Sequence, residues 1–533
     1  MTARTAPGRG TARTGTNPPR NPIARRRRLG TGLAAAAVAL TLGLAACSPS
    51  NGSSSGGVSA FTVARTGDID KLDPQLATAF QTQQTLGLVY SSLVKTGNDG
   101  SIQPDLATKW TLAPDNLTLT LTLRSGVTWQ DGSPFTSADV KASLERILDQ
   151  ATGAVARSNL TVISGVDTPD AATVVLHLSK PAAALLYSLA TVNASIVSAK
   201  DIAAGTVGKT LHGTGPFAWK QWDQGQQVVL TSNRTYYGGA PAIGTLTFRV
   251  IPDEASILSG MKAGAFQIGQ ISDPAIAQQA GSGGGFDLVK QPALSYHTLM
   301  LNGRRGPLQN QQVRQAIACA VDRDQVLKTA AYGDGKVTGP ITSPAYQYPP
   351  TDGLPCTPGD LDRAKELLSS AGYAKGFTLN TIVETGEYAT AGAEAQNLQA
   401  QLAKIGVNLQ LRQLPTSPYV QAWLAADYDA AVALNGGSYD PYLMYGRYFA
   451  TGGSLSKPGG IESPKLADLL AQGNATNDEV RRKAVYGDLQ KELTAQAPWV
   501  WMFRSDDYYL VKSGVNGFAP RPDELLTSLA TVK

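Results

Sequence analysis

The chain has 533 residues, of which 42% are hydrophobic and 16% are charged, and its formal net charge is +5. This length exceeds the roughly 250 to 300 residues at which one core stops growing, so a single small domain is excluded, and the composition excludes a wholly disordered protein. The charge does not indicate a nucleic-acid-binding protein, because eight arginines and no acidic residue precede Cys47. The remaining residues comprise 38 basic and 41 acidic ones, a net charge of −3.

The first 46 residues have the pattern of a signal peptide. Four arginines, Arg25–Arg28, precede an apolar stretch over 29–44 that is shorter than the ~20 residues of a membrane-spanning helix. Leu44-Ala-Ala-Cys47 resembles the lipobox of bacterial lipoproteins, whose cysteine receives diacylglycerol. The sequence predicts a removed signal peptide over 1–46, a lipid anchor on Cys47 and a Ser/Gly-rich tether over 47–60. An uncleaved membrane helix is the alternative, and the arginines leave export open between the general and twin-arginine routes.

Strands and helices are mixed in the region after the tether. A short strand is expected over 61–65, and a turn-rich loop follows it up to Leu72-Asp73-Pro74. Thr118 to Arg124 alternates with period two, which is typical of a half-buried strand. A helix is expected over 137–148, with Thr136 or Ser137 as its cap. Further strands are expected over 173–178, 227–231 and 245–252, and helices over 182–190 and 254–263.

A second region begins near Tyr296 and has the pattern of a βαβ lobe. Helices are expected over 313–321, 362–371 and 391–405, the last two ended by glycines. Strands are expected over 297–302, 377–383, 408–413, 429–434 and 499–503. The overall class is therefore α/β or α+β.

Two cysteines follow Cys47. Cys319 lies in an expected helix and Cys356 in a Pro-rich loop. Because an even pair outside the cytoplasm is typical of a disulfide, the sequence predicts a Cys319–Cys356 bond. The alternative is a buried Cys319 that packs as a small hydrophobe while Cys356 stays free.

Several motifs in fixed order resemble one known family. They include Pro104-Asp-Leu-Ala-Thr-Lys-Trp110, Gly126-Val-Thr-Trp129, Gly213-Thr-Gly-Pro-Phe217, Val321-Asp-Arg-Asp324, Ala371-Gly-Tyr373 and Asp440-Pro441. From about Phe61 to the C-terminus, the chain resembles the extracellular solute-binding proteins of family 5, the oligopeptide-, dipeptide- and nickel-binding lipoproteins of ABC transporters. Most of these motifs also have a structural interpretation; Arg314, Asp322 and Arg323 are expected to pair near a helix end.

The resemblance implies an α/β, two-lobed periplasmic-binding-protein fold of type II, of the large cluster C kind. The first lobe would comprise 61–95, 205–295 and 505–533, with an extra subdomain inserted over 96–204, and the second lobe would comprise 296–504. A solute would bind between the lobes, and the permease would detect their closure about hinge segments. The implied partners are a peptide or other small solute, ABC permease subunits with their ATPases, and the membrane through the lipid anchor. We expect a monomer on the outer face of the cytoplasmic membrane, with no nucleic-acid partner.

The resemblance also indicates solute-binding residues. In peptide-binding relatives the loop after Leu-Asp-Pro contacts the solute, which here indicates Thr78 and Phe80. A carboxylate about four residues before the proline of the second lobe's Asp-Pro pairs with the peptide amine in those relatives, and this position is Gly437 here. A missing carboxylate would leave a buried ammonium unpaired, which argues against a free-amine peptide. The other candidates are Tyr419, Trp423, Asn435, Gly436, Tyr439 and Asp440, the last with the alternative role of capping the turn at Pro441.

The sequence contains no motif of an enzyme in the structural context that its chemistry requires. A Gly-x-Ser-x-Gly pattern at 52–56 lies in the tether, whereas a hydrolase nucleophile needs a strand-to-helix turn. His177, His212 and His297 are isolated, so the sequence predicts no metal site, and it predicts no cofactor. We therefore expect a transporter receptor and not an enzyme. The alternatives are a sensor or adhesion lipoprotein with the same fold, a receptor for a sugar or metal chelate, and an anchored hydrolase.

Overall fold

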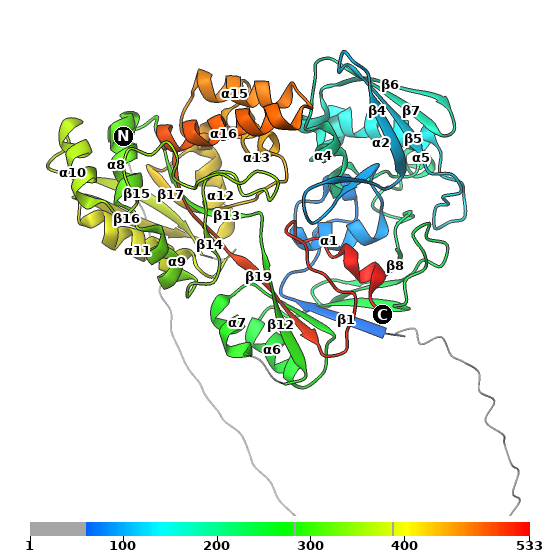
Figure 1. Cartoon of the computed structure of the whole chain (residues 1–533). Coiled ribbons are helices and arrows are strands. Elements are labelled where there is room, and N and C mark those ends of the chain that lie inside the picture. Colours follow the sequence, from blue (N-terminus) through cyan, green and yellow to red (C-terminus); the bar gives the residue numbers. More distant parts are fainter. Residues whose placement is uncertain (1–59, 282–283, 386–387) are drawn as a thin grey trace, which may run out of the picture. The chain divides into compact units, whose positions relative to one another are not determined.

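A seven-stranded mixed sheet contains the first described strand and the last. The computed structural model describes residues 60–281, 284–385 and 388–533 (Figure 1). The strand order is β12-β19-β11-β1-β10-β9-β8, in which β1 runs parallel to β10 and β11 and the other pairs are antiparallel. The strands are β1 (Ala60–Arg65), β8 (Phe217–Asp223), β9 (Gln227–Ser232), β10 (Thr245–Val250), β11 (Ile268–Ile271), β12 (Phe286–Pro292) and β19 (Asp506–Lys512).

A six-stranded sheet has the order β14-β18-β13-β17-β15-β16. Its strand β15 runs parallel to β16 and β17, as expected when helices connect the strands. Every residue of β13 is buried, so its side chains are covered on both faces of the sheet. The strands are β13 (Tyr296–Leu301), β14 (Lys336–Val337), β15 (Phe377–Glu384), β16 (Val407–Leu414), β17 (Ala430–Asn435) and β18 (Trp499–Arg504).

A four-stranded antiparallel sheet of order β4-β5-β7-β6 forms a separate layer with its own core. The expected alternation is seen in β5, where Leu119, Leu121 and Leu123 face the core and the threonines between them do not. The strands are β4 (Ala107–Leu112), β5 (Thr118–Leu123), β6 (Ile163–Asp170) and β7 (Thr173–Leu178), and β2 (Val94–Thr96) pairs with β3 (Ile102–Pro104) nearby in the chain.

Helices cover these sheets. The helix α2 begins after Thr136, whose backbone N–H donates to Asp139 Oδ2 at 2.9 Å in a capping box. On the seven-stranded sheet, α6 and α7 pack against one face, while α1 and residues 526–532 pack against the other. The α-helices are α1 (Phe80–Val89), α2 (Ser137–Leu148), α3 (Arg157–Leu160), α4 (Leu185–Leu189), α5 (Ala199–Ala204), α6 (Glu254–Lys262), α7 (Pro274–Ala280), α8 (Gln311–Ala320), α9 (Arg323–Ala330), α10 (Leu361–Ser370), α11 (Ala391–Ala403), α12 (Thr416–Ala425), α13 (Pro441–Phe449), α14 (Ser456–Gly459), α15 (Pro464–Asn474) and α16 (Glu479–Gln496).

Two neighbouring segments connect the two large sheets. The chain passes from β12 to β13 through Ala293–Ser295 and returns from β18 to β19 through Ser505. Because β12 pairs with β19 and β13 pairs with β18, the two segments lie side by side, and Ala293 N donates to Ser505 O at 3.2 Å. The result is a nearly continuous two-stranded ribbon that enters both sheets (Figure 1).

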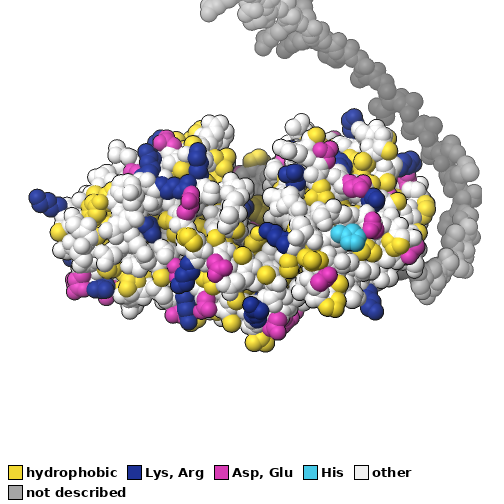
Figure 2. All heavy atoms as spheres, turned by 90° about the horizontal axis from the view of Figure 1, so that it is seen from above, with side chains coloured by type: hydrophobic (Ala, Val, Ile, Leu, Met, Phe, Trp, Pro, Cys, Tyr) yellow, Lys and Arg dark blue, Asp and Glu magenta, His cyan; other side chains and the backbone are white. Residues whose placement is uncertain are grey.

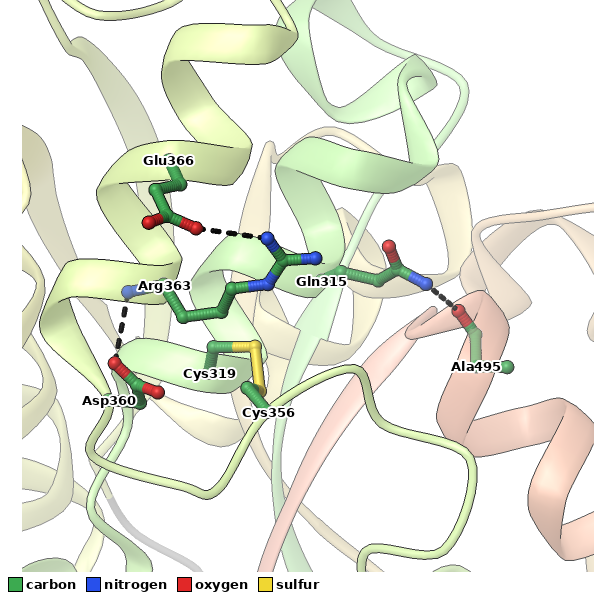
Figure 3. The surroundings of a disulfide bond; sticks show 7 residues. All are labelled: Gln315, Cys319, Cys356, Asp360, Arg363, Glu366 and Ala495. Atoms are coloured by element: carbon green, nitrogen blue, oxygen red, sulfur yellow. Dashed lines mark hydrogen bonds and ion pairs between the residues drawn. A yellow bond between two sulfur atoms is a disulfide. The ribbon is translucent and has the colours of Figure 1, made fainter.

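A disulfide joins Cys319 on α8 to Cys356 in the loop before α10 (Figure 3). Their Cα atoms are 5.8 Å apart, within the usual range for a disulfide. Gln315, one turn earlier on α8, donates to Ala495 O at 2.8 Å, so this helix is also held to the end of α16.

Most expected elements are confirmed, including the strands over 118–123 and 173–178 and the helix capped by Thr136. The expected pairing of Arg314, Asp322 and Arg323 is wrong. Arg314 donates to Gln496 O and Leu308 O, Arg323 donates to Pro350 O, and Asp322 caps α9 through Gln325 N. Both arginines are buried where backbone carbonyls are the available acceptors, so they bind those.

The predicted signal peptide, Cys47 and the tether up to residue 59 lie outside the described residues. Over the face drawn in Figure 2, Lys and Arg side chains are interspersed with Asp and Glu side chains. That distribution agrees with the small net charge of the region after Cys47.

Candidate functional site

Two adjoining cavities lie beside the segments that connect the large sheets, and the larger one is lined by strand residues of both sheets. The larger has a volume of about 450 Å³ and lies at the ends of β1, β11 and β19, with β13 and Leu434 on its other side. The smaller has a volume of about 190 Å³ and is lined by the loop 436–439, the start of α1 and residues 522–525. The two share Phe80, Ser295, Gly436 and Glu524, and we call them together the joint cavity. The larger volume falls in the range of about 300–1,000 Å³ that is usual for small-molecule sites.

One face of the seven-stranded sheet ends in charged residues at this cavity. The apolar members of the face are Phe61 and Val63 on β1 and Tyr509 and Val511 on β19. Because side chains alternate along a strand, Arg65 continues the inward row of β1, and Asp507 continues that of β19. Both residues line the larger cavity. A core face thus changes from apolar to ionic where it meets the cavity.

Arg65 contributes a buried guanidinium with spare hydrogen-bond donors. Its exposed fraction is 2%, and the group lies over the ring of Phe248 at 4.4 Å from the centroid. Nη1 donates to Gln81 O at 3.1 Å, but Nε and Nη2 have no hydrogen-bond partner among the described residues. Burial lowers the pKa of Arg65 to about 9, so the group remains cationic at neutral pH.

Asp507 and Glu524 place two carboxylates in the same cavity. Asp507 is partly exposed as a whole, but its Oδ2 atom is buried and lacks a hydrogen-bond partner among the described residues. Burial, together with repulsion from Glu524 and Asp506, raises the pKa of Asp507 well above its usual range. Burial and the charge of Asp523 raise the pKa of Glu524 to about 7. Neither carboxylate forms an ion pair with another described residue, although the Arg65 guanidinium lines the same cavity.

The loop 436–439 approaches the segment between β12 and β13 closely. A Cβ atom on Gly437 would lie 1.9 Å from the carbonyl oxygen of Leu294, a distance at which no side chain fits. A Cβ on Gly436 would meet no atom within 4 Å. Gly437 thus lacks a carboxylate and, in this conformation, also lacks the space for one.

Several sequence-predicted residues do line the joint cavity. Thr78 lines the larger cavity and donates through Oγ1 to Asp70 Oδ2 at 2.7 Å. Phe80 is 46% exposed and lines both cavities, as does Gly436. Gly437 and Tyr439 line the smaller one.

Tyr419, Trp423, Asn435 and Asp440 line neither cavity. Tyr419 donates to Val432 O at 2.9 Å, and Trp423 Nε1 contacts Met300 Sδ at 3.2 Å. Asn435 donates to Thr298 Oγ1 at 2.9 Å inside the six-stranded sheet. Asp440 caps α13, accepting from Tyr442 N at 2.9 Å, and pairs with Arg482. Burial and these internal partners hold the four side chains within the second large sheet and its helices.

Sequence reasoning missed Arg65, Asp507 and Glu524. A weak signal was present for the first two, because Arg65 occupies the last and Asp507 the first inward-facing position of an otherwise apolar row. Glu524 lies in the C-terminal segment at a φ of 61°, and its sequence surroundings carry no comparable signal.

His297 lies where the two sheets join. Its Nδ1 atom is 2.8 Å from Glu394 Oε1, its Nε2 atom is 3.3 Å from Ser505 Oγ, and its ring stacks on Phe503 at 4.3 Å. Although it lines the larger cavity, it is held on three sides by protein groups. This environment is that of a residue with a structural role.

Within residues 60–281, 284–385 and 388–533, no group of three or more His, Cys, Asp or Glu side chains is arranged to hold a metal ion. In the same ranges, no helix combines the length and apolar character needed to cross a bilayer.

Known proteins resemble this chain over most of its length. The "Probable D,D-dipeptide-binding periplasmic protein DdpA" of Escherichia coli K12 is 26% identical over 479 residues, which covers 87% of this chain and 92% of that protein. The structure of the binding protein AgaA from A. tumefaciens R10 in complex with agropinic acid is 29% identical, with a TM-score of 0.75 and coverage of 89% and 98%. Helicobacter pylori DppA in complex with the peptide STSA is 24% identical, with a TM-score of 0.76 and the same coverage.

These likenesses confirm the two-lobed periplasmic-binding-protein fold. Residues 101–456, more than half of the chain, match the bacterial extracellular solute-binding proteins, family 5. Proteins of this family are exported and bind solutes for transport, so the chain is a binding protein and not an enzyme. The chain belongs to the family 5 bacterial extracellular solute-binding proteins.

Proposed function

We propose that this protein is the receptor of an ABC importer, and that it captures a peptide or peptide-like solute in the joint cavity and delivers it to the permease. The observation that carries this proposal is the cavity itself, because its walls come from both large sheets. A solute there contacts both halves of the fold and favours their approach, and a ligand can shift such an equilibrium only through contacts that differ between the two states.

The lobes follow the sheets. The first lobe comprises 61–95, 205–295 and 505–533, the subdomain 96–204 is inserted in it, and the second lobe comprises 296–504. This division is supported by sheet membership, since each of the three larger sheets takes its strands from one of these parts. Cys47 carries the lipid anchor on the outer face of the membrane, and the predicted tether over 47–60 ends one residue earlier, at 59, because Ala60 already belongs to β1.

The solute contacts Thr78, Phe80, Gly436, Gly437 and Tyr439. Their positions in the walls of the joint cavity support this assignment. Because no side chain fits at Gly437, the loop 436–439 offers no carboxylate to a peptide amine at that position. This favours a peptide-like solute, or a peptide whose amine is bound elsewhere in the cavity. Agropinic acid, bound by the relative AgaA, shows that a receptor of this fold takes solutes other than peptides.

Native mass spectrometry of the protein purified from its own host tests the function. We expect a co-purified small solute, and we expect a deletion strain to lose uptake of that solute and to regain it with the intact gene. Normal uptake in the deletion strain would contradict the importer role, even if the protein binds the solute in vitro.

A further inference from the structure

The geometry points to a zwitterion site that rests on the proposed function and specifies its cargo: Asp507 and Glu524 bind an ammonium group of a dipeptide-sized solute, and Arg65 binds its carboxylate. Arg65 and Asp507 lie on the seven-stranded sheet, and Glu524 lies in the C-terminal segment that shares the smaller cavity with the loop 436–439. The site assigns the two charge contacts to residues 65, 507 and 524.

The first step concerns the two carboxylates. Both line the larger cavity, and Asp507 Oδ2 is buried without a hydrogen-bond donor among the described residues. No salt bridge to Asp507 or Glu524 is present within the described ranges, and the charged groups that act on them are the further acids Asp506 and Asp523. A buried carboxylate oxygen without a donor is costly, so a ligand cation beside Asp507 offsets a desolvation penalty, and the half-buried Glu524 adds a second negative charge there.

The second step is independent of the acids and concerns Arg65. Its guanidinium is 2% exposed and lines the same cavity with Nε and Nη2 unpartnered. Asp68 acts on it electrostatically, but the Asp68 carboxylate already accepts from Trp222 Nε1 and Gly225 N. Two neighbouring guanidinium N–H groups suit a carboxylate, which accepts them in a forked pair.

The opposite charges are separated across the sheet and along it. The strand β11 lies between β1 and β19, and its register places Arg65 level with Tyr509, two residues along β19 from Asp507. The Cα atoms of Arg65 and Asp507 are therefore about 12 Å apart. Both side chains occupy the same face of the sheet. One small solute with a charge at each end therefore spans the two, whereas a singly charged solute leaves one buried group unpaired.

Three synthetic dipeptide mixtures (unblocked, N-acetylated and C-amidated) test the inference in thermal-shift and calorimetric titrations of the purified protein. The unblocked mixture is expected to raise the melting temperature. Each blocked mixture is expected to bind about tenfold or more weakly, because it lacks one charge. Equal binding of the N-acetylated and unblocked mixtures, or no binding of any mixture, would overturn the proposal.

Variants locate the site. The preference for unblocked over N-acetylated dipeptides is expected to disappear in Asp507→Asn and in Glu524→Gln. The preference for unblocked over C-amidated dipeptides is expected to disappear in Arg65→Gln. The matched control is Glu254→Gln. Glu254 lines the same cavity, but its carboxylate accepts from Ser272 N and Asp273 N, so its preferences should stay those of the wild type.

Folding of each variant is checked by its melt without solute. Removing one of two repelling acids should leave the melting temperature of Asp507→Asn and Glu524→Gln at neutral pH equal to or above that of the wild type. If both melt as expected and keep the preference for a free ammonium, the proposal is wrong. If the solute that co-purifies from the host lacks an ammonium group, this inference fails while the importer function stands. If a deletion strain takes up that solute normally, the importer function fails instead.

Discussion

Asp440, the first residue after the loop 436–439, accepts a hydrogen bond from Arg482 Nη2, and both side chains are buried. Asp440 also caps α13, and Arg482 Nε donates to Gly473 O at 3.0 Å near the end of α15. One ion pair thus ties α13, α15 and α16 together. The residue that the sequence offered as a solute ligand instead holds the loop 436–439 in place.

Asp440→Ala should destabilise the protein by about 3–5 kcal/mol, because it leaves the Arg482 charge buried and unpaired. Urea unfolding monitored by fluorescence measures the change. Asp478→Ala is the matched control, since Asp478 caps α16 at an exposed position without an ion pair and should cost only about 1 kcal/mol. Equal losses in the two variants would show that capping alone is at work.

Gly437→Ala should destabilise the protein by about 1–3 kcal/mol, because its Cβ would overlap the carbonyl oxygen of Leu294. Gly436→Ala next to it should be nearly neutral, since a Cβ there has open space. Melting temperatures of the pair decide the point. A stable Gly437→Ala protein would mean that the contact with Leu294 is absent in solution.

The solute-free protein should become less stable as pH rises from about 4.5 to about 7. Glu524, which faces Asp507 and the Arg521–Asp523 ion pair, has its pKa raised from 4.5 to about 7, chiefly by burial. The folded state therefore keeps a proton that the unfolded chain releases, and the stability gained from it is present below pH 4.5 and lost by about pH 7. Melting curves across this range should show the decrease.

Glu524→Gln should reduce that decrease by a few degrees in melting temperature. Glu254→Gln should leave the decrease unchanged, because the Glu254 carboxylate already has backbone donors. An identical pH profile in Glu524→Gln and wild type would contradict a proton on Glu524.

Replacing Cys319 and Cys356 together by alanine should cost about 3–4 kcal/mol, because the bond closes a loop with a sequence separation of 37 residues. Reduction of the wild-type disulfide should lower the melting temperature to about that of the double variant, and the same treatment should not change the melting temperature of the double variant. The disulfide lies away from the lining of the joint cavity, so solute affinity should be unchanged in both cases.

Cys47→Ala should release the protein from host membranes while leaving the melting temperature of its body unchanged. Fractionation followed by a high-salt wash measures the release. Retention of the variant in the washed membranes would show that something other than a lipid on Cys47 holds the protein.

Local patterns predicted much of the fold, and long-range pairing explains what they missed. The period-two run over 118–123 and the capped helix after Thr136 carry their own signals. In β19, Tyr508 and Leu510 pack into one core while Tyr509 and Val511 pack into another, so the strand has no alternation to detect.

The charged site depends on the same long-range pairing. Arg65 and Asp507 are separated by most of the chain, and they line the same cavity only because β11 pairs with both of their strands. The resemblance to family 5 provided the cavity-lining residues Thr78 and Phe80, but a position derived from peptide-binding relatives led to Gly437. The acids that line the cavity lie elsewhere: Asp507 is on β19, and Glu524 is in the C-terminal segment.

The paired segments between the large sheets, Ala293–Ser295 and Ser505, allow bending between the sheets more readily in one direction than in others. A two-stranded ribbon bends readily across its flat face but resists stretching and sliding, because its hydrogen bonds lie in its plane. Ser295 and Ser505 belong to this ribbon and also line the larger cavity. The solute proposed for this cavity would therefore contact the two connecting segments themselves, where bending between the sheets would be concentrated.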